Sequence, residues 1–409
     1  MKRNHSALFA LALAGCLFGT VHSPAAVHYV NANGANATPP YTNWLTAATK
    51  IQDAVNIALA GETIIVTNGL YPGTVNVTNP VALRSVTGPQ FTIIDGGGTN
   101  RCIVLTNSAS LTGFTLTNGY TDGDGAGVWC ASTNVFLTNC VITGNSAVGS
   151  WHVVWWPWPP GHLVPVFGPA NGGGVERGTL YQCTLTGNSA NLGGGAASAI
   201  LYNCTMGGNR AMSSSFSWNG QGYQSPGEGG GVAFCTLNNC IVYFNSAAGG
   251  ANYWGGASDP NYCCTTPLPA DGVGNITNAP LFVDDNNGDL HLQTNSPGIN
   301  AGNNAYVATT TDLDGNPRIA GGTVDMGAYE FQPCITGGQF CDAACSRLAG
   351  FSFTFSGGIV GQPYRIQTST NLAAGSWTDL TNFIYAGSIV VTDSSAVAGP
   401  KRFYRAVSP

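Results

Sequence analysis

Four copies of one motif, Leu-x-x-Cys-x-x-x-x-Asn-x-Ala, run through the middle of the chain, and every spacing inside the motif is fixed. The copies begin at Leu137, Leu180, Leu201 and Leu237. A Gly-rich triplet precedes each copy, and nearly all of the length variation lies between the Ala and the next triplet. A constant block joined by one variable corner is typical of a stacked solenoid.

The shortest period, from Cys183 to Cys204, is 21 residues. This length is too short for a pair of helices and suits one turn of a three-sided parallel β-helix. Runs such as 135–143 alternate β-branched and polar residues, and no apolar 3.6-residue repeat occurs between about residues 100 and 260. We therefore predict an all-β fold whose turns stack about 4.8 Å apart.

Stacking explains the residue types of the motif. We expect Leu, Cys and the apolar residue two beyond the Cys to point inward and form ladders. We expect the amide before each Cys to bond the next amide of its series and to take the left-handed backbone of a tight corner. The four amides are Asn139, Gln182, Asn203 and Asn239. Ladder thiols pointing the same way suit a disulfide poorly, so the cluster Cys334, Cys341 and Cys345 is the better place for a bridge.

The N-terminus predicts export. Lys2 and Arg3 precede an apolar stretch, and Ala25 ends a small-x-small site, so residues 1–25 are expected to be a signal peptide. The alternative is a lipoprotein signal ending before Cys16, because 13–16 matches the bacterial lipobox. No other apolar segment approaches membrane length. Residues 43–60 carry helical apolar spacing and predict a helix over the first rung.

Charged residues make up only 8% of the chain, and acidic side chains outnumber basic ones, 19 to 13. A sparse and weakly acidic charge set argues against nucleic acid and anionic membrane surfaces as partners.

Several segments are similar to known families. Residues 28–31, 49–55 and 60–71 resemble the N-terminal cap of right-handed parallel β-helix proteins of the pectin-lyase-like superfamily. Segments between Ala279 and Phe331, including Asp312-Leu-Asp-Gly-Asn-Pro-Arg, look like the choice-of-anchor Q domain. The Gly-Gly-Gly-Val and Tyr243-Phe-Asn-Ser-Ala elements are similar to repeats of polymorphic outer membrane proteins. The resemblance implies a right-handed β-helix in a secreted or surface protein of a bacterium.

These patterns divide the chain into segments. We expect the β-helix with its cap over 27–278, a choice-of-anchor Q-like end over 279–331, a Cys-containing linker over 332–348 and a small β-sandwich over 349–409. The alternating strands around 351–355, 364–368 and 389–392 support the last of these.

The superfamily includes pectin-degrading enzymes, so the resemblance also implies a carbohydrate-active enzyme as an alternative. Glycoside hydrolysis needs two carboxylates within about 5–9.5 Å of each other. The candidates in the coils are Asp122, Asp124 and Glu228, but Asp124 and Glu228 lie three rungs apart, roughly 14 Å at strand spacing. Asp122 and Asp124 also suit a turn. We therefore expect a protein without catalysis, and the alternative is a polysaccharide lyase or glycoside hydrolase.

Two inserts are rich in aromatic residues. Compared with the 21-residue period, the chain adds 22 residues after Ala147 and 15 after Ala211. Exposed aromatic side chains on a rigid scaffold stack on sugars or anchor proteins, although the same residues also suit a private core between the inserts. The predicted binding residues are Trp151, Trp155, Trp156, Trp158, Trp218 and Tyr223.

Asp312, Asp314 and Asp325 predict a structural calcium site or, alternatively, a salt-bridged cap in which Arg318 pairs with Asp325 or Glu330. No other cofactor is expected. The sequence as a whole predicts a secreted or envelope-associated protein that binds a polysaccharide or a cell-surface protein through its aromatic inserts.

Overall fold

The fold is that of a computed structural model. It describes residues 25–106, 108–156, 162–255, 260–332, 339–346, 350–356, 358, 360–371, 376–398 and 402–407. The expected signal peptide, apart from Ala25, lies outside these residues.

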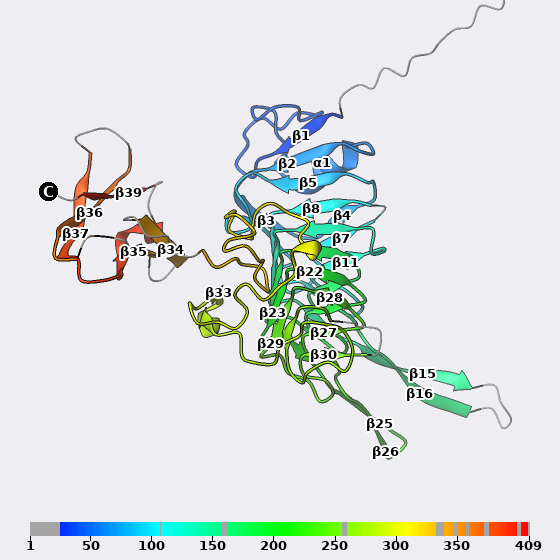
Figure 1. Ribbon diagram of the computed structural model, residues 1–409. Coiled ribbons are helices and arrows are strands. Elements are labelled where there is room, and N and C mark those ends of the chain that lie inside the picture. Colours follow the sequence, from blue (N-terminus) through cyan, green and yellow to red (C-terminus); the bar gives the residue numbers. More distant parts are fainter. Residues whose placement is uncertain are drawn as a thin grey trace, which may run out of the picture.

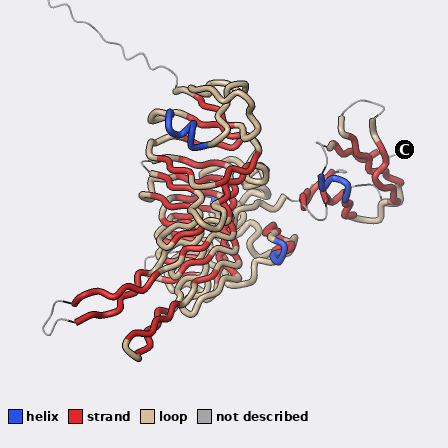
Figure 2. The backbone as a smooth tube through the Cα atoms, turned by 180° about the vertical axis from the view of Figure 1, so that it is seen from behind, coloured by secondary structure: helices blue, strands red, loops and turns tan. Residues whose placement is uncertain are grey.

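Three long parallel sheets form the sides of a solenoid (Figures 1 and 2). The first sheet contains β1 (Val27–Val30), β2 (Thr63–Val66), β5 (Ala82–Ser85), β8 (Ser110–Thr112), β12 (Phe136–Thr138), β18 (Thr179–Tyr181), β22 (Ile200–Tyr202) and β28 (Thr236–Asn238). The second contains β3 (Gly69–Pro72), β6 (Thr92–Asp95), β9 (Thr115–Thr117), β13 (Val141–Thr143), β19 (Thr184–Thr186), β23 (Thr205–Gly207), β29 (Ile241–Tyr243) and β31 (Cys264–Thr265). The third contains β4 (Val75–Val77), β7 (Ile103–Leu105), β11 (Val128–Cys130), β17 (Val175–Glu176), β21 (Ala196–Ala197), β27 (Val232–Ala233) and β30 (Tyr253–Trp254). The predicted three-sided parallel β-helix is therefore confirmed.

A short fourth sheet lines one corner of the solenoid. It consists of two-residue strands: β10 (Tyr120–Thr121), β14 (Ser146–Ala147), β20 (Ser189–Ala190) and β24 (Arg210–Ala211). Small Ala side chains of this corner, including Ala147 and Ala190, form their own buried cluster. Both aromatic inserts leave from this corner.

The repeat fixes the register of the sheets. Leu137, Leu180, Leu201 and Leu237 pair in line across four rungs, and all are fully buried. The cysteines one corner further on are also buried and free. Each acts as a small apolar side chain in a continuous core. Cys334 and the side chains of Cys341 and Cys345 lie outside the described residues.

The predicted amide ladder occurs at a different position. Asn139, Gln182, Asn203 and Asn239 do have the expected left-handed backbone, with φ of 50–52°. The side chains of Gln182, Asn203 and Asn239, however, donate to carbonyls of residues 303–325, outside the solenoid. Asn239 Nδ2, for example, donates to the carbonyl of Asn303 at 2.9 Å. The ladder of bonded amides is formed instead by the Asn of the motif, five residues after each Cys, and it continues to Asn252. Its motif members are Asn145, Asn188, Asn209 and Asn245.

The first rung is capped by a shorter helix than expected. Helix α1 spans Ile51–Ile57 and buries Ile51, Ala54 and Val55. Gln52 accepts from the backbone N–H of Asn76 in β4 at 2.7 Å, which places α1 at the end of the third sheet, while β1 closes the first. Residues 43–46 form a turn organised by the side chain of Asn43 instead of helix.

Residues 279–331 lie along the side of the solenoid and not over its last rung. The segment contains the antiparallel pair β32 (Phe282–Asp284) and β33 (Asp289–Leu292) and the 3-10 turns η1 (Asp285–Asn287) and η2 (Asn304–Tyr306). It binds the outward amides of several rungs, as between Asn203 Nδ2 and the carbonyl of Asp325, 3.4 Å. The last rung is closed by the preceding loop, where Ile276 bridges Cys264. The expected end cap is therefore a lateral buttress.

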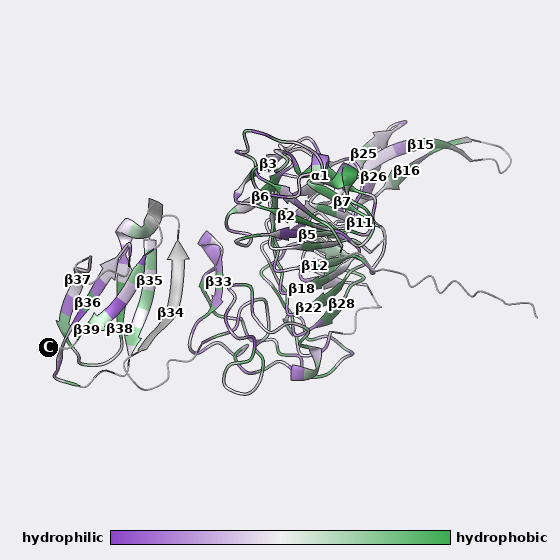
Figure 3. Cartoon of the chain, turned by 90° about the horizontal axis from the view of Figure 1, so that it is seen from above, coloured by the Kyte–Doolittle hydropathy of each residue, from purple (hydrophilic) through white to green (hydrophobic). Residues whose placement is uncertain are grey.

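The C-terminal module has two antiparallel sheets around one apolar core that includes Phe353, Phe355 and Ile366. One sheet contains β34 (Gln339–Ser346), β35 (Gly350–Ser356) and β38 (Ile389–Asp393), and the other β37 (Thr378–Ile384), β36 (Pro363–Ser369) and β39 (Phe403–Val407), with η3 at Ser394–Ala398. Strand β34 lies within the segment that was expected to be a linker. The module stands beside the solenoid (Figures 1 and 3).

Candidate functional site

Two β-hairpins project from the short fourth sheet (Figures 1 and 2). The first joins β15 (Ser150–Trp156) to β16 (His162–Gly168), and the second joins β25 (Ser214–Trp218) to β26 (Gln221–Ser225). Only β20 separates the strands after which they leave, β14 and β24, so the hairpins start two rungs apart, as the repeat spacing predicts. No Asp, Glu, Lys or Arg occurs from 125 to 175 or from 211 to 227. Both arms are therefore almost uncharged.

The bases of the two hairpins pack against each other through Trp151. Its ring stacks on Phe216 of the second hairpin, with centroids 5.6 Å apart and planes at 15°. It also contacts Tyr223 at 6.1 Å and Phe167 at 5.0 Å. The indole Nε1 donates to Ser214 Oγ at 3.0 Å. An aromatic ring fixed by three neighbours and a hydrogen bond holds the two arms together at their bases.

The outer part of the first hairpin carries the same apolar face into solvent. Trp151 pairs with Phe167, Val153 with Pro165, and Trp155 with Leu163, so these side chains share one face of the hairpin. Beyond the reach of the second hairpin, Trp155 is 62% exposed and Leu163 is 51% exposed. We call the set Val153, Trp155, Leu163 and Pro165 the Trp155 face.

The other predicted aromatic residues differ in whether they pack at the hairpin bases. Tyr223 contacts Trp151, and Trp218 stacks on Phe216 with centroids 6.3 Å apart while remaining half-exposed. Trp158 and the side chain of Trp156 lie outside the described residues. The aromatic residues of the inserts thus pack together at the hairpin bases and form an exposed apolar face further out. The core interpretation describes the bases, and the binding interpretation concerns the outer part.

Glu228 does not come together with the other two carboxylates proposed for catalysis. Asp122 is exposed, and Asp124 Oδ1 accepts from the backbone N–H of Asn171 at 2.8 Å. Asn171 pairs with Leu192 and Leu192 with Glu228, which puts Glu228 three rungs from Asp124. That spacing is roughly 14 Å, too far for the two groups to flank one glycosidic bond.

A carboxylate that sequence reasoning passed over has the most altered environment in the coils. Glu176 lies in register between Trp129 and Ala197 on the outer side of the third sheet, and its side chain is only 4% exposed. Arg177 Nε lies 3.5 Å from Oε1, whereas Oε2 has no hydrogen-bond partner among the described residues. Burial, together with nearby Asp124, raises the pKa of Glu176 to about 7. The sequence did contain a signal for this site: Glu176 is charged, whereas the next two rungs have Ala197 and Ala233 at the same position.

The three aspartates proposed for calcium already accept hydrogen bonds. Asp312 accepts from the backbone N–H groups of Asn316 and Glu330, Asp325 from two further backbone N–H groups, and Asp314 from His291. Arg318 is 1% exposed, and its Nη1 lies 3.9 Å from Glu330 Oε2. In the described part of the chain, no three His, Cys, Asp or Glu side chains are arranged to hold a metal ion. Nor does any described helix have the length and apolarity to cross a membrane.

Comparison with known proteins shows similarity of fold. No protein-family model matches the sequence, and no curated protein matches it significantly. Among solved structures, a pectate lyase is 13% identical with a TM-score of 0.34, over 75% of this chain and 97% of the other. A pectin methylesterase from Aspergillus niger is 14% identical with a TM-score of 0.32, over 62% and 86%. A pectin methylesterase in complex with a hexasaccharide is 12% identical with a TM-score of 0.30, over 59% and 72%. The similarity to these three structures is one of fold, the parallel β-helix.

Proposed function

We propose that the protein is an exported, non-catalytic β-helix protein that binds polysaccharide through the Trp155 face. The observation that carries the proposal is the change along one hairpin face: Trp151 is locked against Phe216, and Trp155, on the same face, is open to solvent. A flat indole held on a fixed support offers apolar area at small entropic cost, and the apolar faces of sugar rings fit such a surface.

The lack of charged residues in the hairpins supports a contact with an uncharged ligand. Because the arms lack Asp, Glu, Lys and Arg, binding there depends on stacking and not on ion pairing, and it should change little with salt. The alternative function, a polysaccharide lyase or glycoside hydrolase, needs a carboxylate pair open to substrate. Among the described coil residues Glu176 is buried, and Asp124 and Glu228 are three rungs apart, so this function has less support.

The cellular location belongs to the same proposal. The signal-like N-terminus and the resemblance of 279–331 to the choice-of-anchor Q domain support secretion or display on the bacterial envelope. The likeness of the Gly-rich repeats to those of polymorphic outer membrane proteins points the same way. A cell-surface protein would be the partner instead if the Trp155 face binds no glycan.

The test is retention on insoluble cellulose, xylan and pectin, with reducing ends and unsaturated products measured in the same samples. We expect retention without new products. Trp155→Ala should weaken retention about tenfold, or about 1.4 kcal/mol. Trp44→Ala is the matched control, because Trp44 is 42% exposed and contacts Tyr29 of β1, the first strand of the solenoid. New chain ends, or equal retention of both variants, would contradict the proposal.

A further inference from the structure

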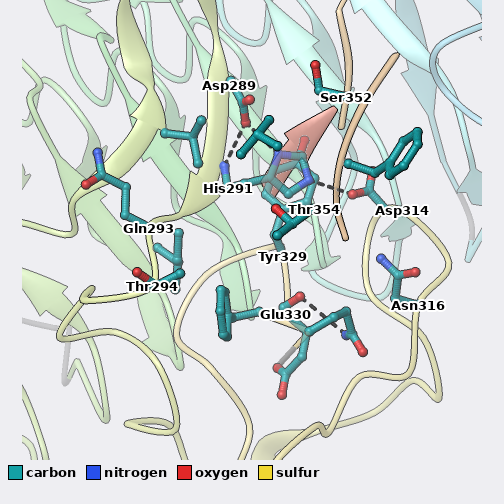
Figure 4. A pocket seen from close by; sticks show the side chains of 16 residues that line it. Asp289, His291, Gln293, Thr294, Asp314, Asn316, Tyr329, Glu330, Ser352 and Thr354 are labelled. Atoms are coloured by element: carbon teal, nitrogen blue, oxygen red, sulfur yellow. Dashed lines mark hydrogen bonds and ion pairs between the residues drawn. The ribbon is translucent and has the colours of Figure 1, made fainter. Parts of the chain in front are cut away.

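A cavity of about 560 Å³ lies between the lateral buttress and the C-terminal module (Figure 4). Strand β33 and residues 314–332 form one wall, and Ser352, Thr354 and Val390 of the module form the other. The volume falls within the range of about 300–1,000 Å³ that is typical of small-molecule sites. The cavity and the hairpins lie on opposite sides of the solenoid (Figures 1 and 2).

One histidine organises the polar wall of this cavity. His291 Nδ1 lies 2.5 Å from Asp289 Oδ1, and its Nε2 lies 2.6 Å from Asp314 Oδ2. Tyr329 covers the ring, with centroids 4.0 Å apart. Burial by itself lowers the pKa of His291, but the hydrogen bonds to the two carboxylates raise it to about 10. The imidazole is therefore charged at neutral pH and fixed in orientation by both neighbours.

Each of the two aspartates keeps one oxygen for a ligand. Among the described residues, no hydrogen bond reaches Asp289 Oδ2 or Asp314 Oδ1, and the two side chains are 29% and 23% exposed. Because the carboxylates bond opposite nitrogens of one ring, they stand on opposite sides of it and cannot close on a single small ion. They can instead accept hydrogen bonds from two separate donors of one extended ligand.

The charge of the cavity restricts the ligand further. Among the described residues that line the cavity are Asp289, Asp314 and Glu330, and none of them is Lys or Arg. The carboxylate of Glu330 is fully buried and accepts from the backbone N–H groups of Ala320 and Asp325. The remaining balance of two carboxylates and one imidazolium is negative, which disfavours anions such as uronates.

We propose that this cavity binds an uncharged oligosaccharide, whose hydroxyl groups donate to Asp289 and Asp314 and whose apolar ring faces lie against Phe331 and Val390. A neutral sugar supplies several hydroxyl donors at ring spacing together with apolar C–H faces, and the cavity presents acceptors and apolar side chains side by side. The inference does not rest on the hairpin proposal, because it concerns different residues on another side of the molecule.

The experiment is titration calorimetry of the full mature chain with cellotriose, xylotriose and mannotriose, and with trigalacturonate as the anionic probe. At least one neutral probe should bind, and trigalacturonate should bind at least about tenfold more weakly. Val390 is 68% exposed on β38, so Val390→Trp should fill the cavity without disturbing the fold and lower the neutral probe's affinity at least about tenfold. Ile384→Trp, at a 69% exposed residue of the module's other sheet, is the matched control and should bind normally.

Two further variants make the outcome specific. The double variant Asp289→Asn and Asp314→Asn removes both negative charges at nearly constant volume, so it should lose affinity for the neutral probe and discriminate less against trigalacturonate. Trp155→Ala should bind the trisaccharide normally, which separates failure of the hairpin proposal from failure of this one. The inference is overturned if no neutral probe binds, if trigalacturonate binds equally well, or if Val390→Trp binds like the unaltered protein.

Discussion

Nδ2 of Asn188 donates a 3.0 Å hydrogen bond to Oδ1 of Asn209, one rung further along the solenoid. The same Nδ2 donates to the carbonyl of Ile142, and its Oδ1 accepts from the backbone and the side chain of Asn145. Asn188 is completely buried. A buried side chain that satisfies two other rungs at once couples the stacking of neighbouring turns.

Replacing Asn188 should therefore cost more than losing one hydrogen bond. Asn188→Ala leaves the buried backbone N–H of Asn145 without its acceptor and removes the Nδ2 donor from the carbonyl of Ile142 and from Asn209 Oδ1. An unpaired buried group costs about 1–3 kcal/mol. We expect the free energy of unfolding in urea to fall by about 3 kcal/mol. Ser189→Ala, which removes the 3.0 Å contact with Ser146 Oγ at the next position, should cost less than about 1 kcal/mol. Equal losses would show that the ladder is not coupled.

The contact between Trp151 and Phe216 should couple the two hairpins. A double-mutant cycle of Trp151→Ala and Phe216→Ala, read from hydrogen exchange of the β15 and β16 amides, should give a coupling of about 1 kcal/mol. Trp151→Ala combined with Phe136→Ala, an exposed residue of the first sheet, should be additive. Additivity in both cycles would mean that the arms are held independently.

Glu176 should make stability depend on pH. Its pKa rises from 4.5 to about 7 on folding because of burial and Asp124. Between these values the folded protein binds more protons than the unfolded chain, so stability falls as pH rises, by up to about 3 kcal/mol. In Glu176→Gln, the free energy of unfolding should depend less on pH between pH 4.5 and 7. At pH 8 the variant should be more stable than the unaltered protein. Asp122→Asn, at an exposed carboxylate, should keep the original slope. Parallel curves for Glu176→Gln and the unaltered protein would refute the assignment.

Arg318 should be essential to the lateral buttress. Its Nη2 donates to the carbonyls of Asp325 and Gly327 at 2.9 and 2.7 Å, and its charge lies beside buried Glu330. Arg318→Ala leaves that carboxylate buried without its cation, at a cost of about 3–5 kcal/mol. Arg318→Met, which keeps most of the volume, should cost less. The control Arg84→Ala removes an exposed cation and should change the midpoint of urea unfolding little. A similar midpoint for Arg318→Ala and Arg84→Ala would contradict this role.

The position of the proposed binding residues could be predicted only in part. The insert lengths and the fixed repeat indicated two arms on one corner. Both inserts follow the Ala of the motif, so both leave the solenoid at the same position of a rung. Which aromatic rings become core and which stay exposed depends on how far the second hairpin reaches along the first, and this separates Trp151 from Trp155. The cavity around His291 was missed because Asp289, Asp314 and Val390 meet only after distant segments pack together.

The sequence by itself determined the solenoid. A 21-residue period with Leu, Cys and Asn at constant spacing admits one register, since a one-residue slip would turn every ladder outward. It did not determine which of two amide series bonds along the axis, because both consist largely of Asn and the direction of each side chain depends on the corner backbone. Asn139 has a left-handed backbone, whereas Asn188 does not and is completely buried. Tertiary structure likewise decided that Glu176 is buried and that residues 279–331 lie along the side, because burial depends on neighbours that are distant in the chain.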